Sequence, residues 1–222
     1  MVFNLSKIAP LAETVLNERT FARGLRYLTR RDPDMASIRK EVGSPPMWVR
    51  DPGFPTLVRI ILEQQVSLAS ARAAFNKLNA SASPLTPCRF LELDDELLKS
   101  IGFSRQKAAY CRNLAESIIN GHLDLDRLPE MDAAAAAAAL RRVKGIGQWT
   151  ADIYLLVALR RPDAWPSGDL ALAVAVQMVK GLSRRPSPDK MEKISQVWRP
   201  WRAVAARMLW HYYLSKVRPV RV

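Results

Sequence analysis

Apolar residues recur at the three- and four-residue spacing of α-helices through most of this chain, and no segment shows the alternation of a β-strand with hairpin turns. The longest such pattern runs from Thr56 to Leu78, where Leu57, Ile60 and Phe75 fall on one broad face, and it predicts a long helix. One or two further helices are expected within residues 1–43, and one or two within residues 189–217. Single helices are expected near residues 88–100, 104–120, 132–143, 148–160 and 170–181.

Turn and capping residues divide this pattern. Gly43–Pro46 is typical of a linker, and Pro200 predicts a break or kink in the last helical segment. Ser104 is a good N-terminal cap, and Asp132 suits the start of the alanine-rich stretch that follows it. Alanine has the highest helix propensity, so this stretch predicts an ordinary helix. The chain is therefore predicted to be all-α.

The overall charge narrows the choice of partner. The 222 residues carry a formal net charge of +13, and the sequence pI is about 10.3. Such an excess favours a polyanion, because lysine and arginine gain by displacing counterions from phosphates. The plainer interpretation is a basic protein with a solvated surface.

Cysteine and histidine are too scarce for several kinds of site. Cys88 and Cys111 are the only cysteines, which excludes a four-cysteine iron–sulfur cluster and favours neither a zinc site nor a disulfide framework. With only His122 and His211, a histidine-rich metal site or a Ser-His-Asp triad is not expected. No apolar run of about eighteen residues and no signal-peptide pattern occurs, so we expect a soluble intracellular protein.

A short glycine motif predicts a phosphate-binding turn between two helices. In Gly145-Ile146-Gly147, glycine permits positive φ and close backbone approach, while Ile146 can plug into the core. The amides of Gly145, Gly147 and Thr150 would then lie at a helix N-terminus, where an anion is favoured, with Lys144 adding a mobile charge. The alternative is a purely structural turn, since two glycines flanking one residue are a weak signal.

A lone carboxylate follows this motif. Asp169, in the segment Trp165–Leu170, is placed at the start of a predicted helix. A carboxylate near an anomeric carbon stabilises the positive charge that develops when an N-glycosidic bond breaks. The alternative role is a helix N-cap, and the two roles are compatible. Asp163, the nearest other acid, has the pattern of a surface residue after Pro162.

Several motifs, in order across roughly residues 53–215, resemble the helix–hairpin–helix DNA glycosylase superfamily. The chain is similar to its alkylation-repair branch, the 3-methyladenine DNA glycosylase II group, in a compact form. The motifs that carry the resemblance are Val143–Asp152, Pro166–Asp169, Glu63–Ser67, Ile101–Ala108, Trp198–Arg202 and Trp210–Tyr213. The resemblance implies two helical subdomains with the active-site cleft between them. They would be residues 1–45 with about 160–222, and residues 46–159 with the hairpin at 143–147.

The resemblance also implies roles for individual residues. Asp169 would be catalytic. Trp149 and Trp210 would line the base pocket, with Tyr154 and Tyr213 as weaker candidates. Gln65 would fill the gap left by the flipped nucleotide. The DNA contacts would be Lys144, Gly145, Gly147, Thr150, Gln65 and Ser67, and the backbone carbonyls of Arg141, Val143 and Ile146 would hold a monovalent cation. Core packing is the alternative for the tryptophans, and a helix cap or polar network is the alternative for Gln64 and Gln65.

Position 149 bears on the reaction, because bifunctional relatives carry a lysine there for a Schiff-base lyase step. Trp149 therefore predicts a monofunctional glycosylase that requires no cofactor. With no second acid nearby, the resemblance favours N-alkylated bases of the 3-methyladenine and 7-methylguanine type, which leave readily because they already carry positive charge. The expected partner is double-stranded DNA containing damaged bases, bound by a monomer without a membrane. It would work beside the nucleoid in a bacterial cytoplasm or in a eukaryotic nucleus.

Two other interpretations remain open at this point. The protein could be a glycosylase for mismatched or deaminated bases, or a non-catalytic helix–hairpin–helix protein that binds DNA. An RNA-binding module has no support, because the chain lacks an aromatic strand pattern for stacking bases.

Overall fold

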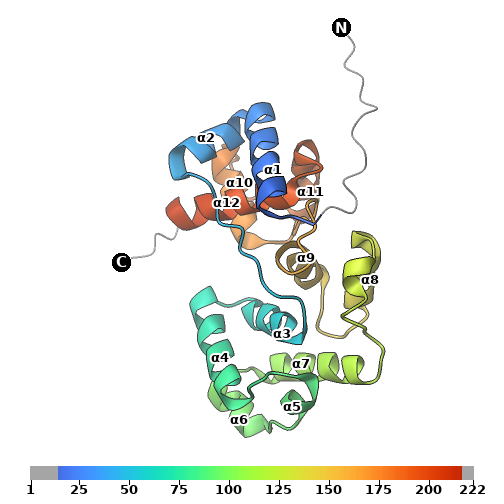
Figure 1. Cartoon of the computed structure of the whole chain (residues 1–222). Coiled ribbons are helices and arrows are strands. Elements are labelled where there is room, and N and C mark those ends of the chain that lie inside the picture. Colours follow the sequence, from blue (N-terminus) through green and yellow to red (C-terminus); the bar gives the residue numbers. More distant parts are fainter. Residues whose placement is uncertain (1–14, 217–222) are drawn as a thin grey trace. The chain divides into compact units, whose positions relative to one another are not determined.

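The computed structural model describes residues 15–216, and the expectations for residues 1–14 lie outside the described residues (Figure 1). Within residues 15–216 the chain forms twelve α-helices, two short 3-10 helices and no β-strand, which confirms the all-α prediction. Two compact units are present. Unit 1 comprises residues 1–49 and 160–222, and unit 2 comprises residues 50–159. The boundaries expected from the resemblance were at 45/46 and about 160.

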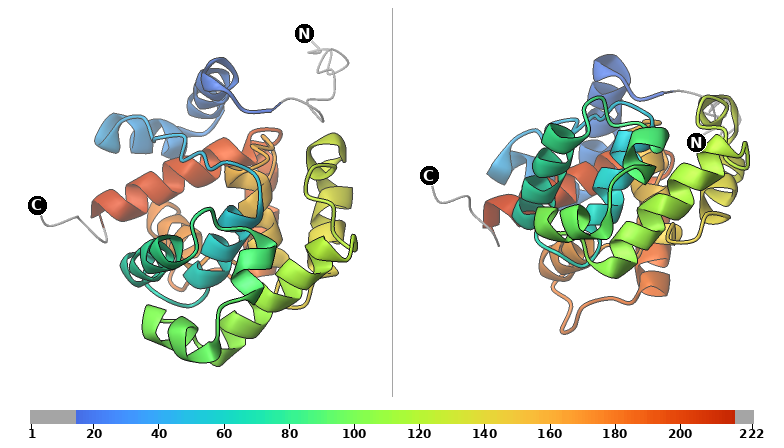
Figure 2. Two further views of the ribbon diagram at one scale, coloured as in Figure 1. Left: turned by 60° about the horizontal axis from the view of Figure 1, so that its bottom comes forward. Right: turned by 90° about the horizontal axis from the view of Figure 1, so that it is seen from below.

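Unit 1 is built around its last helix. Its elements are α1 (Glu18–Arg31), α2 (Pro33–Val42), α10 (Leu170–Val179), α11 (Pro188–Ser195), η4 (Gln196–Trp198) and α12 (Arg202–Lys216). Helix α12 contacts α1, α2 and α10 (Figure 2). The side chains from Ala203 to Leu209 are almost completely buried. Trp198 and Trp201 also lie in this core, so packing is their role here. The break expected at Pro200 separates η4 from α12.

Asp32 joins α1, α2 and the C-terminal part of unit 1. One carboxylate oxygen caps α2 by accepting hydrogen bonds from the amides of Asp34 and Met35, at 2.9 and 3.4 Å. The other accepts from the Trp198 indole at 2.7 Å and from Lys180 at 3.3 Å. Burial raises the pKa of Asp32, but the Trp198 bond, the charge of Lys180 and the Asp34 amide together lower it by more. The pKa therefore lies below the ordinary value, and the carboxylate stays ionised at neutral pH.

The lowered pKa of Asp32 predicts a pH-dependent contribution to stability. A carboxylate whose pKa is lower in the folded protein stabilises it above the unfolded pKa, near 4, and that stabilisation is lost as pH falls through the folded pKa. We expect Asp32→Asn to lower the free energy of unfolding by about 1–3 kcal/mol at pH 7, with the difference shrinking below pH 4. Urea unfolding of both proteins at pH 7, 5 and 3 measures this. A difference that is constant across the series would contradict the role of the charge.

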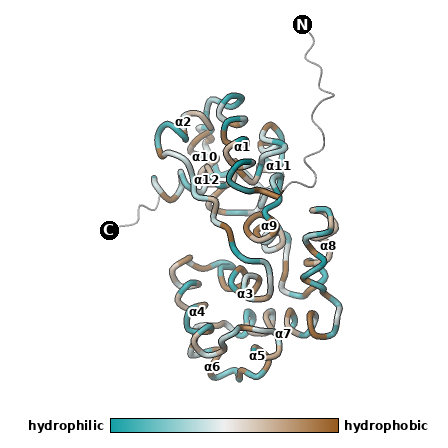
Figure 3. Tube along the Cα trace, viewed as in Figure 1, coloured by the Kyte–Doolittle hydropathy of each residue, from teal (hydrophilic) through white to brown (hydrophobic). Residues whose placement is uncertain are grey.

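Unit 2 contains the remaining helices, and its core includes Leu57, Ile60 and Ile61, which are fully buried. Helix α3 is central, because it contacts α4, α7 and α9. Hydrophobic and hydrophilic stretches follow one another along the helices of this unit, as expected for helices with one buried face (Figure 3). Its elements are α3 (Phe54–Glu63), α4 (Leu68–Ser81), α5 (Pro87–Leu91), α6 (Asp95–Ile101), α7 (Arg105–Ile119), η3 (Leu128–Glu130), α8 (Ala133–Arg141) and α9 (Gln148–Val157).

The prediction of one long helix over Thr56–Leu78 is wrong, because the chain turns between α3 and α4. Gln65 adopts a φ of +56°, and Ser67 starts the next helix by accepting a hydrogen bond from the Ser70 amide at 3.1 Å. Both helices bury apolar faces, so the helical spacing continues through the turn and hides it. The helix expected at residues 88–100 likewise consists of two, α5 and α6. The caps predicted at Ser104 and Asp132 are confirmed.

Among the described residues, no helix has the length and apolar character needed to cross a bilayer.

Candidate functional site

Asp169 stands at the N-terminus of α10, as its position in the sequence predicts. Its Oδ1 atom accepts a hydrogen bond from the Leu172 amide at 2.9 Å, which confirms the N-cap. The same oxygen accepts from the Trp210 indole nitrogen, on α12, at 3.1 Å. Asp169 is 9 % exposed. Donors from two helices thus set the orientation of the carboxylate at the N-terminus of α10.

A second tryptophan lies against Trp210. The ring of Trp48 meets the ring of Trp210 edge-to-face, with centroids 6.4 Å apart and planes at 71°. It also lies 6.3 Å from the ring of His211. All three rings are half-buried. Unit 1 therefore brings a carboxylate and two indoles together, which is a suitable environment for a flat, positively charged group.

Trp48 is a candidate site residue that the sequence reasoning missed. It lies directly after the linker Gly43–Pro46 and Met47, where surface polarity is expected, and a large aromatic side chain in such a segment is the signal that could have found it. Its φ of +45° is uncommon for a residue with a bulky side chain. Such a conformation persists only where surrounding contacts determine it.

Helix α12 supplies those contacts from one face. Arg207 donates from Nε to the carbonyl oxygen of Met47, and the His211 ring forms a hydrogen bond of 2.8 Å with the carbonyl oxygen of Val42. Residues 207, 210 and 211 are spaced three and four apart, so they share a face of the helix. Burial lowers the pKa of the Arg207 guanidinium to about 10, so it remains charged at neutral pH. The linker is thereby held against α12 on both sides of its prolines.

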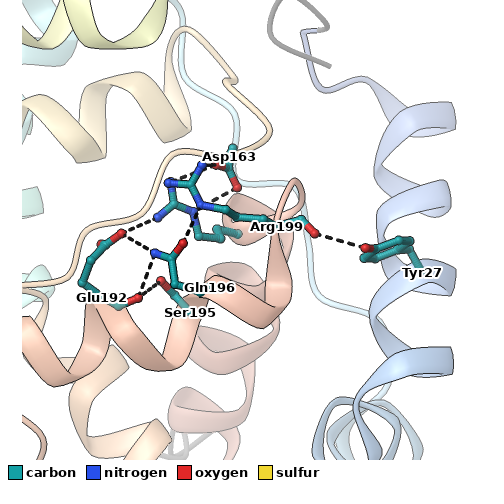
Figure 4. A network of polar contacts seen from close by, with 7 residues as sticks. Tyr27, Asp163, Glu192, Ser195, Gln196 and Arg199 are labelled. Atoms are coloured by element: carbon teal, nitrogen blue, oxygen red, sulfur yellow. Dashed lines mark hydrogen bonds and ion pairs between the residues drawn. The ribbon is translucent and has the colours of Figure 1, made fainter. Parts of the chain in front are cut away.

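The loop leading to Asp169 is tied down by a cluster of ion pairs (Figure 4). Asp163 accepts two hydrogen bonds from Arg202, at 2.9 and 2.8 Å, and pairs with Arg199 at 3.1 Å. Arg202 also pairs with Glu192 at 2.7 Å. The prediction that Asp163 is a plain surface residue is wrong, because its carboxylate is half-buried in this cluster. The cluster fixes the loop rather than supplying a second acid.

Unit 2 holds the glycine turn between α8 and α9. Gly145 has the positive φ that the motif predicts, +103°, and Ile146 is buried as expected, whereas Gly147 has an ordinary φ of −87°. Gly147 is the N-cap of α9, and glycine has no side chain with which to cap the amides of the first turn. Lys144 and Gly147 are exposed, and Gly145 is half-buried. This arrangement is compatible with an anion at the α9 N-terminus.

Gln64 connects this turn to the end of α3. Its amide nitrogen donates to the carbonyl oxygen of Gly145 at 3.1 Å and to the hydroxyl of Thr150 at 2.9 Å. Thr150 is only 2 % exposed, so its side chain serves the interior of unit 2 rather than a DNA surface. Gln65 and Ser67 are exposed in the α3–α4 turn. The structure thus supports a polar network at Gln64 and leaves Gln65 accessible.

The predicted base-pocket residues fall into different environments. Trp149 is half-buried in the first turn of α9, and Tyr213 is half-buried one turn after Trp210 on α12. Tyr154 is completely buried, and its hydroxyl accepts a hydrogen bond from the Gly53 amide at 2.9 Å. The weaker prediction that Tyr154 lines a base pocket is therefore wrong, because no part of its ring is accessible to a base.

The carbonyls proposed for a monovalent cation lie at the end of α8 and in the turn after it. Val143 already accepts a hydrogen bond from the Ile146 amide at 3.0 Å, and a carbonyl oxygen has a second lone pair. Arg141 is the last residue of α8, where carbonyls lack intrahelical partners and the dipole is negative. The donor set fits such an ion, and the cation site stays a prediction.

Relatives of the chain include proteins named as DNA glycosylases or as similar to them. It is 27 % identical to the alkylbase DNA glycosidase-like protein mag2 of Schizosaccharomyces pombe over 86 % of this chain and 92 % of that protein. It is 28 % identical to DNA-3-methyladenine glycosylase 1 of the same yeast, over 75 % of this chain and 77 % of that protein. Among solved structures, the S. pombe 3-methyladenine DNA glycosylase Mag1 in complex with abasic DNA has a TM-score of 0.80 and 26 % identity. That match covers 85 % of this chain and 95 % of the other.

The family model of the HhH-GPD superfamily base excision DNA repair proteins matches residues 58–200. This range is more than half of the chain and includes the later part of α3, the glycine turn and Asp169. The chain therefore belongs to the HhH-GPD superfamily of base excision DNA repair proteins.

Proposed function

We propose that this protein is a monofunctional DNA glycosylase that flips an alkylated base out of duplex DNA and hydrolyses its N-glycosidic bond. The observation that carries the proposal is Asp169, a carboxylate held at a helix N-terminus by Leu172 and Trp210 beside a second indole. The names of the yeast relatives point to 3-methyladenine and other alkylated bases. The specific substrates proposed are bases of the 3-methyladenine and 7-methylguanine type.

The chemistry follows from the charge of the leaving base. A purine alkylated on a ring nitrogen is cationic, and it departs as a neutral base when it takes the electron pair of the bond to the sugar. The sugar is left with positive charge at its anomeric carbon, and the Asp169 carboxylate stabilises that charge. Water then adds at this carbon and releases a proton. No acid is needed to protonate the leaving base, in keeping with the structural role of Asp163.

The indoles supply recognition of the flipped base. A cation over an indole face gains electrostatic energy from the ring quadrupole, most strongly where water is excluded. Trp210 and Trp48 are half-buried and adjacent, and Trp210 also orients the carboxylate. The unit 2 turn would bind a backbone phosphate, through Lys144 and the amides of Gly145 and Gly147, while Gln65 and Ser67 would contact the strand near the gap. Tyr213, on the same helix as Trp210, would extend the pocket in unit 1, and the role of Trp149 in base binding stays a prediction.

The proposal is tested by incubating the protein with DNA treated with a methylating agent and identifying the released bases by chromatography. We expect free methylated purines, with strands that break only after alkali treatment. Strand cleavage without alkali would show a lyase step, which Trp149 in place of lysine does not provide. Release only from mismatched or deaminated pairs would identify a different glycosylase. DNA binding without any release would identify a non-catalytic member of the superfamily.

Trp48 has a specific expected effect on substrate choice. We expect Trp48→Ala to slow release of cationic methylpurines about 10-fold, because it removes an indole contribution of about 1–2 kcal/mol, and Trp48→Phe to retain most of the rate. Release of a neutral lesion such as hypoxanthine should fall less. The measurement is the single-turnover rate on both substrates.

Val49→Ala is the matched control for Trp48, because Val49 follows it in the chain and is 46 % exposed. This variant should release both bases at the wild-type rate. If Trp48→Ala and the wild type released methylpurines at equal rates, Trp48 would not contribute to base recognition.

A further inference from the structure

Positive charge is distributed very unevenly between the two units. Unit 1 contains 21 lysines and arginines against 9 acidic residues, whereas unit 2 contains 13 against 12. Nearly all of the net charge of +13 therefore belongs to unit 1, and the unit that carries the glycine turn is close to neutral. Long-range attraction of a polyanion must then come mainly from unit 1.

Many of the cations in unit 1 are already engaged. Lys180 pairs with Asp32 and Asp34, and Lys216 pairs with Glu41. Arg199 and Arg202 belong to the cluster around Asp163, and Arg207 is buried beneath the linker. These residues hold the unit together and offer little charge to a ligand.

Helix α1 carries four exposed arginines in a regular row. Arg19, Arg23, Arg26 and Arg30 are all exposed, and we call them the α1 arginine stripe. Their spacing of four, three and four residues places them within a sector of about 60° along roughly 16 Å of helix. Within residues 15–216, none of the four forms an ion pair, and the only acidic residue of α1 is Glu18 at its first position.

The opposite face of α1 fixes the stripe in place. Phe21, Leu25 and Leu28 are buried, and Gly24 brings the helix close to α12. A Cβ atom on Gly24 would lie 2.8 Å from Val204 and 2.9 Å from Trp201, so this close approach requires glycine. The apolar face of α1 is thus already used inside unit 1, which leaves no face for insertion into a membrane. The arginines are presented on a rigid support.

We propose that the α1 arginine stripe is a second DNA-binding surface, which holds phosphates of the duplex backbone apart from the contacts of the glycine turn. Duplex DNA has one phosphate per strand about every 3.4 Å along its axis, so a stripe of about 16 Å spans roughly five phosphates. All four residues are arginines, whose planar guanidinium groups bind phosphate in a bidentate manner. The surface reads no bases and raises affinity for any sequence. This inference rests on the DNA partner of the proposed function but not on catalysis.

The test compares two variants of equal net charge. One replaces the four stripe arginines by glutamine. The matched control replaces four other exposed cations of unit 1 by glutamine, namely Arg184, Arg185, Lys190 and Lys193. Binding to an undamaged duplex of about 40 base pairs is measured between 50 and 300 mM salt. We expect the slope of log affinity against log salt to fall in magnitude by about two to four for the stripe variant, because each lost phosphate contact removes about 0.9.

The control should keep a slope within about one of wild type. A third variant, with the stripe arginines changed to lysine, should keep most of the slope, because lysine retains the point charge. Thermal unfolding should be unchanged in all variants, since the replaced side chains are exposed.

Equal slopes for wild type and the stripe variant would overturn the proposal, as would an equal loss in both charge-matched variants. Loss of binding to anionic lipid vesicles or to an acidic protein partner, with the DNA slope unchanged, would assign the stripe to that class instead and overturn it too. Failure of the wild-type protein to bind DNA at all would instead contradict the proposed function.

Discussion

Asp169→Asn is expected to slow base release by at least about 100-fold while leaving the protein folded and bound to DNA. The variant loses the negative charge that faces the developing positive charge on the sugar, and removal of one well-placed electrostatic contact at a reacting centre costs about 100- to 1,000-fold. Asparagine keeps an oxygen that accepts from the Leu172 amide and from the Trp210 indole, the two donors that orient Asp169. Single-turnover release of methylpurines and an affinity measurement on the same duplex separate the two effects.

Asp169→Ala is the companion variant. It removes the cap as well as the charge, so it should also lower the free energy of unfolding by about 0.5–2 kcal/mol. Base release at the wild-type rate in folded Asp169→Asn would exclude the carboxylate from catalysis and would make the N-cap its only role.

Gly145→Ala is expected to have the largest effect on stability. A Cβ atom on Gly145 would lie 2.3 Å from Cγ and 2.5 Å from Cβ of Tyr110 on α7, and the φ of +103° is unfavourable for any residue with a side chain. We expect the free energy of unfolding of unit 2 to fall by about 2–5 kcal/mol, from backbone strain and overpacking together. Urea unfolding followed by circular dichroism measures the change.

The second glycine of the motif provides the matched control. Gly147 has a φ of −87°, and a Cβ atom there would meet nothing within 4 Å, so Gly147→Ala should cost about 1 kcal/mol or less. Tyr110→Ala combined with Gly145→Ala should recover only the part of the loss due to the tyrosine ring, because alanine keeps the Cβ atom of residue 110 at 2.5 Å. Similar stability for the two glycine variants would contradict the close packing of Gly145 against Tyr110.

Features that depend on neighbouring residues were predictable from the sequence. The caps at Ser104, Asp132 and Asp169 were predicted because a short polar side chain before an apolar periodic segment bonds to an amide three residues later. The burial of Ile146 and the positive φ of Gly145 followed from the demands of a tight reversal between two helices.

Features set by distant residues were not predictable in the same way. The turn at Gln64–Ser67 contains neither glycine nor proline, and the side chain of Gln64 makes its hydrogen bonds with residues more than 80 positions away. The roles of Trp48 and Asp163 likewise depend on α12, which lies far along the chain from Trp48. Tyr154 was assigned to the pocket by resemblance, and only its bond to Gly53 shows that it belongs to the core.

Unit 1 is formed by two segments that are far apart in the chain, and this has a consequence for its biosynthesis. Helices α1 and α2 leave the ribosome about 160 residues before α12, the helix on which they pack. At about 5–20 residues per second, their apolar faces wait roughly 8–32 seconds for that partner. Unit 2 is continuous in the chain, so it can form during this interval. The faces of α1 and α2 that pack on α12 therefore stay uncovered until α12 has been synthesised.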